Sequence, residues 1–313
     1  MKPLAQIVLS LILTFVICQL AYLVINKGTE RYYIHKEERL TELFKNRTTF
    51  DVLFVGSSRT HTSINPKIVD SVCQLHSYNA GVEGGNLLEF KMTIEAYLQN
   101  HPPPAMLLLT LDINSFDLKR PFFNYSQYLP FVKNRVINQT LNNNGHRTAL
   151  IKLLPFMKIA SYDDYMKGNA LKGLKGNNEI PEGEYQYKGY MTNTQRGLKD
   201  TQVIVTGYRQ AAVAAKAVDY LDDIIKRCST NKIKLLFSYA PEFKNGLQDQ
   251  FSNKEEVFNL VDSIAVKNNI TYFRDDKLSL CTEPELFANF GHVNRKGADK
   301  YSMIVAERLC DKR

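Results

Sequence analysis

The sequence predicts a three-layer α/β/α protein with a largely parallel sheet, preceded by one N-terminal transmembrane helix. Two observations carry this prediction. From about residue 50, short apolar runs alternate with longer amphipathic segments, and residues 4–25 form one uncharged, mostly aliphatic stretch. Alternating strands and helices imply right-handed βαβ units with helices on both faces of the sheet. With 313 residues, 44% of them hydrophobic, the chain can bury the core of one large domain.

The N-terminal stretch is long enough to cross a hydrocarbon core of about 30 Å as a helix. We expect residues 1–26 to be a transmembrane anchor. A cleaved signal peptide is the alternative, but the stretch is longer than a usual signal-peptide core and no Ala-x-Ala follows it. Residues 27–49 are polar, with Leu40, Leu43 and Phe44 at helical spacing, so we expect a stalk helix there.

The charges that flank the apolar stretch leave its orientation open. Lys2 stands alone before it, and four basic residues follow it: Lys27, Arg31, Lys36 and Arg39. The positive-inside rule would therefore leave the large domain in the cytoplasm. A flank of three residues, however, gives this rule little to count.

The overall charge, the histidines and the cysteines limit the partners, metal sites and disulfides that can be expected. The 40 Lys and Arg residues exceed the 32 Asp and Glu residues, and this net charge of +8 favours anionic partners such as membrane headgroups or acidic polymers. Because the basic residues are scattered, we expect no nucleic-acid binding. The histidines are dispersed and no Cys-x-x-Cys occurs, so no metal and no cofactor is expected. Four cysteines, namely Cys73, Cys228, Cys281 and Cys310, could form two bridges or stay reduced.

The expected domain spans residues 50–313. Its strands are expected at 51–55, 75–79, 106–111, 233–239 and 270–273. Its helices are expected at about 66–72, 87–99, 206–228 and 254–268, with a final helix that ends near 309. An insertion at about 115–200, rich in Tyr, Asn, Lys and Gly, should hold loops and short helices. The insertion can be a substrate-recognition lid or a poorly constrained excursion, and the sequence favours neither.

The first expected strand stops at Gly56, and Ser57, Ser58 and Arg59 follow it. In open α/β sheets, ligand sites lie at the carboxyl ends of strands, so these side chains stand where chemistry is usually done. A serine that only caps the next helix is the simpler interpretation.

Three further short segments stand beside other expected elements, and together with Gly56-Ser57-Ser58 they make four blocks. Gly84 lies in the glycine-rich segment after the second strand, and Asn114 comes just past the third. His292 precedes the final helix, and Asn289 stands three residues before it. Taken singly, these positions indicate a turn, an Asx turn and a structural histidine.

Together, the four blocks resemble the SGNH (GDSL-type) hydrolase superfamily, in the same order, from about residue 51 to 310. The Gly56-Ser57-Ser58 variant is similar to that of membrane-attached, cell-envelope members. The resemblance implies a flavodoxin-like SGNH-hydrolase fold, with Ser58 as nucleophile and His292 as general base. It also implies an oxyanion hole formed by the Ser58 and Gly84 N–H groups and the Asn114 side chain.

Asn289 departs from the family pattern, which has an aspartate at this position to orient and charge-stabilise the histidine. Three interpretations follow: Ser58 and His292 act as a dyad with a neutral acceptor, another carboxylate takes the place of the aspartate, or the site is inactive. The carboxylates nearest in sequence are Asp275, Asp276, Glu283 and Glu285.

The resemblance also implies a function. We expect a membrane-anchored serine esterase or O-acyltransferase that acts on ester groups, expected to be O-acetyl, of a cell-surface glycan or envelope polymer. A membrane protein that donates the acyl group is a possible partner. The domain is then expected on the extracytoplasmic side of the cell membrane, where such polymers lie. The alternatives are a lipid or small-ester hydrolase and a binding or scaffold protein that keeps the fold without the activity.

Overall fold

The computed structural model describes residues 2–311 except 33, 161, 163, 177–185, 193–196, 200–208 and 245. The chain divides into two compact units. The first joins Met1–Lys45 with Asn124–Ile180, and the second joins Asn46–Phe123 with Pro181–Arg313. The second unit holds the sheet.

Five parallel strands form this sheet in the order β2-β1-β3-β6-β7. They are β1 (Val52–Val55), β2 (Ser77–Asn79), β3 (Met106–Thr110), β6 (Lys234–Tyr239) and β7 (Thr271–Arg274). All five expected strands are present, and the predicted α/β class is confirmed. The strand order reverses between β1 and β3, and such a switch point is where open α/β sheets open a crevice at their carboxyl edge.

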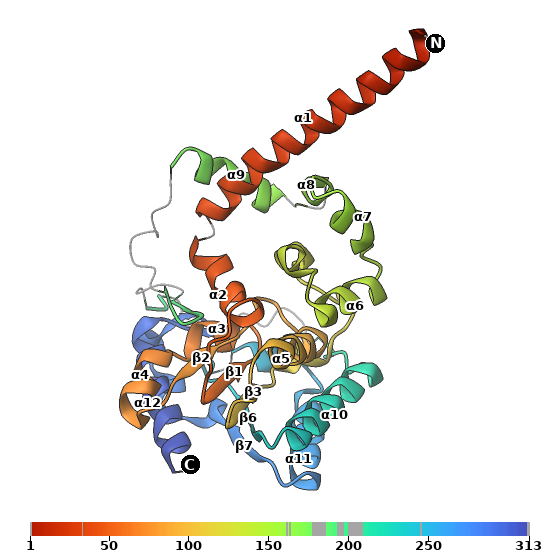
Figure 1. The fold of residues 1–313 in the computed structure, drawn as a ribbon. Coiled ribbons are helices and arrows are strands. Elements are labelled where there is room, and N and C mark those ends of the chain that lie inside the picture. Colours follow the sequence, from red (N-terminus) through yellow and green to blue (C-terminus); the bar gives the residue numbers. More distant parts are fainter. Residues whose placement is uncertain are drawn as a thin grey trace. The chain divides into compact units, whose positions relative to one another are not determined.

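Helices cover both faces of the sheet. One layer holds α3 (Ser58–Ser63), α4 (Pro66–Cys73) and α12 (Arg295–Cys310), and the other holds α5 (Leu87–Asn100), α10 (Ala215–Thr230) and α11 (Lys254–Lys267) (Figure 1). The core beside α4 and α12 includes Val52 and Phe54 of β1, and the alternate residues Leu53 and Val55 are buried as well. A strand buried on both faces explains why its sequence is continuously apolar.

Asparagine side chains cap the N-termini of α4 and α5. Asn65 precedes α4 and accepts a hydrogen bond from the Lys67 N–H. Asn86 precedes α5 and accepts from the N–H groups of Leu88 and Glu89. Each cap pairs N–H groups that have no partner within the helix, and a cap of this kind stabilises a helix by about 1 kcal/mol.

Helix α10 differs from the expectation. It begins at Ala215, and Ala211 lies in the preceding loop, where its N–H donates to Asn253 Oδ1 at 2.8 Å. Residues 206–208, expected to begin this helix, lie outside the described residues. Within the helix, Ala215 is exposed and Val218 is only partly buried. The buried face instead repeats at helical spacing, and its members are Ala217, Leu221, Ile224 and Cys228.

The expected insertion does hold short helices. They are η1 (Ile113–Phe116), η2 (Tyr125–Phe131), α6 (Arg135–Asn143), α7 (Thr148–Leu153), α8 (Met157–Ala160) and α9 (Asp164–Leu174). A small hairpin of β4 (Gln186–Tyr187) and β5 (Tyr190–Met191) was not expected. A second hairpin follows β7 and consists of β8 (Phe287–Asn289) and β9 (His292–Val293). The remaining short turns are η3 (Leu247–Gln250), η4 (Asp275–Lys277), η5 (Ser279–Thr282) and η6 (Pro284–Leu286).

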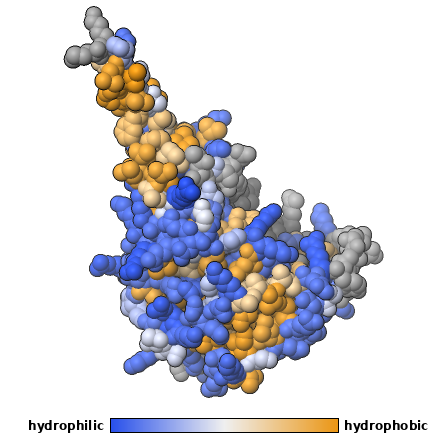
Figure 2. Space-filling model, turned by 90° about the vertical axis from the view of Figure 1, so that its right-hand side faces the viewer, coloured by the Kyte–Doolittle hydropathy of each residue, from blue (hydrophilic) through white to orange (hydrophobic). Residues whose placement is uncertain are grey.

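The N-terminal helices are α1 (Lys2–Tyr32) and α2 (Ile34–Phe44). The segment Pro3–Gly28 of α1 is long and apolar enough to cross a membrane, and apolar side chains cover it (Figure 2). Leu40, Leu43 and Phe44 of α2, expected in a stalk, are buried. The Phe44 ring packs edge-on against Phe131, with 5.4 Å between the ring centroids.

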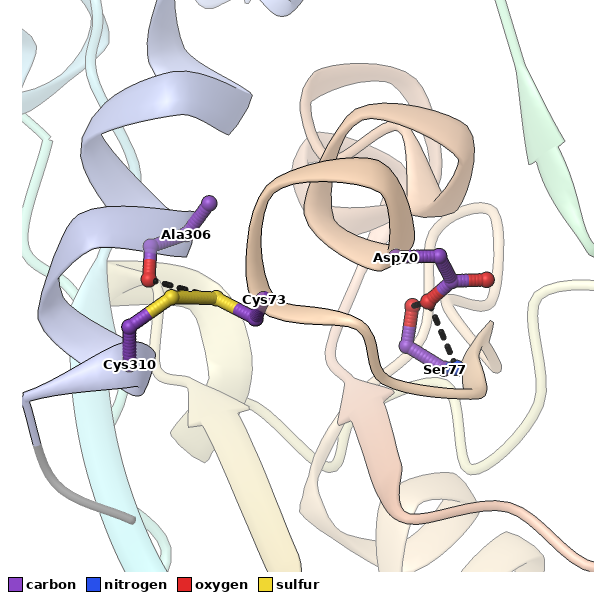
Figure 3. The surroundings of a disulfide bond; sticks show 5 residues. All are labelled: Asp70, Cys73, Ser77, Ala306 and Cys310. Carbon is purple, nitrogen blue, oxygen red and sulfur yellow. Dashed lines mark hydrogen bonds between the residues drawn. A yellow bond between two sulfur atoms is a disulfide. The ribbon is translucent and has the colours of Figure 1, made fainter.

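A disulfide links Cys73 and Cys310, the last residues of α4 and α12 (Figure 3). The Cys73 sulfur lies 3.0 Å from the carbonyl oxygen of Ala306. Cys228 and Cys281 are buried free thiols. The chain therefore forms one of the two bridges that four cysteines allow.

Candidate active site

The turn after β1 gives its two serines different surroundings. Ser57 is the N-cap of α3, and its side chain accepts a hydrogen bond from the Arg59 N–H at 3.2 Å. Ser58 is the first helical residue, so its own N–H has no partner within the helix. The capping interpretation therefore applies to Ser57, while the Ser58 hydroxyl faces His292. Gly56 is required here, because a Cβ on it would lie 2.9 Å from the Thr110 Cβ.

Ser58, His292 and Asn289 form one chain of hydrogen bonds. Ser58 Oγ lies 2.9 Å from His292 Nε2, and His292 Nδ1 lies 3.0 Å from Asn289 Oδ1. The Gly291 N–H also donates to Asn289 Oδ1 at 3.0 Å. Because a backbone N–H can only donate, it fixes the amide oxygen toward the ring, so Nδ1 carries the proton. Nε2 is then the acceptor for the Ser58 hydroxyl.

The His292 imidazole is held in its neutral form. Burial lowers its pKa below the ordinary 6.5, and the positive charge of Arg59 lowers it further, while Asp112 and Glu83 act in the opposite direction. A neutral imidazole at neutral pH can accept a proton from Ser58. This is the protonation state that a general base needs.

The carboxylates considered as substitutes for the missing aspartate have other surroundings. Three of them are paired: Asp275 with Tyr301 and Arg308, Asp276 with Arg274, and Glu283 with Lys300. The fourth, Glu285, is exposed. Since Asn289 itself occupies the Nδ1 side of His292, the geometry favours the dyad over a substitute carboxylate.

The candidate oxyanion donors line the same pocket as Ser58 and His292, a cavity of about 410 Å³. Gly84 has a φ of +63°, and a Cβ there would meet the Phe123 ring at 2.5 Å, so the position requires glycine. Asn114 is exposed in η1. Across the part of the chain that the structure describes, neither the Gly84 N–H nor the Asn114 side-chain amide has a hydrogen-bond partner. Both groups are therefore free to bind a ligand oxygen.

A buried ion pair stabilises the turn that carries Ser58. Arg59 Nη1 donates to Asp112 Oδ1 at 2.7 Å, and both side chains are almost fully buried. The Ser57 hydroxyl donates to the other oxygen of Asp112, and Arg59 Nη2 donates to the carbonyl oxygen of Ala240. Both neighbours of Ser58 are thus tied to one carboxylate just past the end of β3.

Asp112 also begins the turn that carries Asn114. Its N–H donates to Ser115 Oγ at 2.8 Å, and its carbonyl oxygen accepts from the Ser115 N–H at 2.9 Å. Asp112 thereby connects the serine turn to the Asn114 turn, although no role for it was predicted from the sequence. A pairing of buried charges between separate strand ends has no signature in local sequence.

Glu242 lies on the other side of Arg59, at 3.7 Å from Nη2. Burial raises the pKa of Glu242 to about 7, although the Arg59 charge acts against this rise. The Arg59 guanidinium also lies over the Tyr239 ring, 4.4 Å from its centroid. Arg59 is thus enclosed by the ends of β3 and β6.

His61 follows Ser58 by three residues but does not line the pocket. It is 6% exposed, on the buried side of α3. Gly81 packs directly against its backbone, where a Cβ would come within 2.5 Å of the His61 nitrogen. Among the described residues, no group of three or more His, Cys, Asp or Glu side chains is arranged to hold a metal ion.

No protein-family model and no curated protein matches the sequence. The structure is similar to a GDSL-like lipase from Bacteroides thetaiotaomicron, with 11% identity, a TM-score of 0.40, and coverage of 91% of this chain and 98% of the other. It is also similar to an acetyl xylan esterase, with 12% identity, a TM-score of 0.41 and coverage of 83% and 98%. A Bacteroides fragilis protein named as a candidate acylhydrolase has 10% identity, a TM-score of 0.42 and coverage of 91% and 97%.

At these scores the similarities carry no information on individual residues. The fold assignment therefore rests on the strand order and on the four blocks that meet at one edge of the sheet. The chain has an α/β fold, whose five-stranded parallel sheet brings Ser58 within hydrogen-bonding distance of His292.

Proposed function

We propose that the protein is an SGNH-type serine esterase or acyltransferase, and that Ser58 is its nucleophile. The observation that carries this proposal is the 2.9 Å contact between Ser58 Oγ and His292 Nε2, with the tautomer set by Asn289. A serine hydroxyl becomes a nucleophile when an adjacent base accepts its proton. The pocket beside this pair contains free donors for the charge that develops on an attacked carbonyl.

The chemistry follows in two halves. Ser58 Oγ attacks the ester carbonyl while its proton passes to His292 Nε2. The carbonyl oxygen becomes an oxyanion, which the Ser58 N–H, the Gly84 N–H and the Asn114 amide stabilise. The C–O bond to the alcohol then breaks, and His292 returns the proton to the departing oxygen. Water, or a second hydroxyl in a transferase, attacks the acyl-enzyme by the same route and releases Ser58.

Asn289 sets the expected rate. Its amide oxygen orients the ring but carries no charge to stabilise the imidazolium that forms during attack. Replacing the corresponding aspartate by asparagine in a chymotrypsin-type protease lowers turnover by about 10⁴. We therefore assign a slow or conditional dyad enzyme to this site.

For the substrate, we propose an acylated cell-envelope glycan or polymer, with acetyl as the acyl group. A membrane-bound acyl donor is the corresponding partner if the enzyme is a transferase. The apolar segment Pro3–Gly28 supports a membrane anchor, and a signal sequence is the alternative that meets the same length and composition criteria. The Cys73–Cys310 disulfide supports an oxidising, extracytoplasmic compartment, because such bonds are rare in reducing ones.

Protease treatment of sealed cells tests the location. Digestion of the domain from outside, after permeabilisation of any outer membrane, supports the extracytoplasmic assignment. Protection of the domain until the inner membrane is lysed contradicts both this location and the glycan substrate.

A panel of esters tests the activity. The wild-type protein and Ser58→Ala are assayed on p-nitrophenyl acetate, longer p-nitrophenyl esters and O-acetylated glycans. We expect turnover of acetyl esters by the wild type alone. Preference for long acyl chains would instead favour a lipid esterase. A folded wild type without turnover on any ester would favour the scaffold alternative, for which Asn289 is the motivating observation.

A further inference from the structure

Two cations stand at the rim of the candidate pocket. Lys119 and Arg120 line the cavity with Ser58 and His292, and both residues are exposed. Within the described ranges, neither side chain forms an ion pair or a hydrogen bond with the protein. Their charges are therefore available to a ligand that enters the pocket.

The loop that carries these cations is held in place. Asn86 is 4% exposed, and its side-chain amide donates to the carbonyl oxygens of Arg120 at 3.0 Å and Pro121 at 3.4 Å. The Lys119 N–H donates to Asp117 Oδ1 at 2.8 Å. The same Asn86 caps α5, so the loop is fixed to the start of that helix.

The start of α5 adds to the positive potential. Gly84, Gly85 and Asn86 line the pocket immediately before this helix of 14 residues. A helix N-terminus carries the equivalent of about half a positive charge and favours anions nearby. The helix dipole and the two cations therefore act in the same direction.

The acidic groups around the pocket offset only part of this charge. Asp112 lines the pocket, but its charge is paired with Arg59. Asp117 lines it without an ion-pair partner in the described part of the chain. Glu83 is exposed next to Gly84 and its charge acts on His292, but it does not line the pocket. Among the residues that line the pocket, the two positive charges of Lys119 and Arg120 exceed the one negative charge of Asp117.

We infer that the pocket selects esters whose alcohol portion carries an anionic group, a carboxylate or a phosphate, close to the acylated hydroxyl. The inference rests on the proposed function and adds the charge of the substrate. Lys119 and Arg120 bind the anionic group while the acyl carbonyl lies at Ser58. Phe123, which is 59% exposed at the rim, offers an apolar face for a sugar ring.

Matched substrates test this selection. The probes are the mono-O-acetyl esters of methyl glucoside, methyl glucuronoside and methyl glucoside 6-phosphate, which differ only in the anionic group. We expect kcat/KM to be about 3- to 30-fold higher for one or both anionic esters, the range for two partly exposed ion pairs. The ester with the larger gain distinguishes carboxylate from phosphate. The preference should shrink between low and high salt.

The double variant Lys119→Ala/Arg120→Ala should lose this preference, so that its kcat/KM falls further on the anionic esters than on the neutral ester. Lys267→Ala, which removes an exposed cation from the far end of α11, is the matched control. It should change neither the preference for anionic esters nor kcat/KM on the neutral ester. Equal kcat/KM for all three wild-type substrates, or an equal loss on all three in the double variant, overturns the inference. Turnover of the neutral ester in that case leaves the proposed function intact.

A binding measurement keeps the inference testable without turnover. Calorimetry on Ser58→Ala compares the three acetyl esters, which this variant should bind without hydrolysis. Tighter binding of an anionic ester, lost in the Lys119→Ala/Arg120→Ala background, supports the inference even if no rate is measurable. Equal affinity for all three contradicts it.

Discussion

Replacing Asn289 by aspartate should convert the neutral support of His292 into a charged one. The amide oxygen of Asn289 already accepts from His292 Nδ1 and from the Gly291 N–H, each at 3.0 Å. A carboxylate of the same size keeps both hydrogen bonds. The change therefore adds one negative charge beside the ring and leaves the geometry of the site in place.

The size of the gain follows from Coulomb's law. With the charges of a carboxylate and an imidazolium about 4 Å apart, the attraction is about 1 kcal/mol in bulk water and about 4 kcal/mol near a protein surface. These limits correspond to an increase in turnover of about 5-fold to about 10³-fold. Asn289 is exposed, so solvent screening keeps the gain below the factor of about 10⁴ known for a buried aspartate.

The pH dependence gives a second readout. A carboxylate beside Nδ1 favours the charged imidazole, so Asn289→Asp should raise the pKa of His292, which burial lowers in the wild type. The general base must be neutral to act. The acidic limb of the pH profile of kcat/KM should therefore move to higher pH in the variant. The assay is initial-rate hydrolysis of p-nitrophenyl acetate across this limb.

Asn289→Ala is the control, because it removes the acceptor and should lower turnover. Little change or a loss in Asn289→Asp, with a folded protein and a measurable wild-type rate, would refute the dyad and indicate that another carboxylate already supports His292. No activity in either protein would indicate a site that has lost catalysis. A wild-type rate typical of charged triads, unaffected by Asn289→Asp, would also contradict the reasoning.

Three further outcomes are expected. Asn114→Ala should lower turnover by about 10²–10³ with unchanged stability, as for the loss of one oxyanion donor, and a change in melting temperature alone would favour an Asx turn. Arg59→Met should raise the pKa of His292, because it removes a positive charge, and should shift the acidic limb of the pH profile to higher pH. Arg59→Lys keeps the charge and should leave the limb in place. Identical acidic limbs in Arg59→Met and the wild type would exclude electrostatic coupling between Arg59 and His292. Reducing Cys73–Cys310 should destabilise the fold by about 2–5 kcal/mol, measured by urea unfolding with and without reductant, and superimposable curves would contradict a formed bridge.

The strands and most helices of the sheet could be predicted because their signals are local. Val52–Val55 is a continuous apolar run because both of its faces are covered. The start of α10 was misplaced because Ala211 is compatible with a helix and with the loop in which Asn253 binds it. Helix propensity alone cannot decide between these two environments.

For the site, too, the local features could be predicted from the sequence and the long-range contacts could not. Ser58, His292 and the loops with Gly84 and Asn114 follow recognisable elements, so their meeting at one edge could be expected. The pairing of Arg59 with Asp112 could not, because it depends on two strand ends that are 53 residues apart in sequence. The sequence also left open whether Asn289 or a nearby carboxylate contacts His292. The structure was needed to show that Asn289 Oδ1 lies at His292 Nδ1.

Covalent labelling tests the central claim most directly. The full-length protein is treated with a fluorophosphonate, which reacts with activated serines, and the modified peptide is identified by mass spectrometry. We predict a single adduct on Ser58 that is absent in Ser58→Ala and strongly reduced in His292→Ala, and that persists in Ser57→Ala if that variant folds. An adduct on Ser57, or none on folded wild-type protein at any pH of the profile, would contradict Ser58 as the nucleophile.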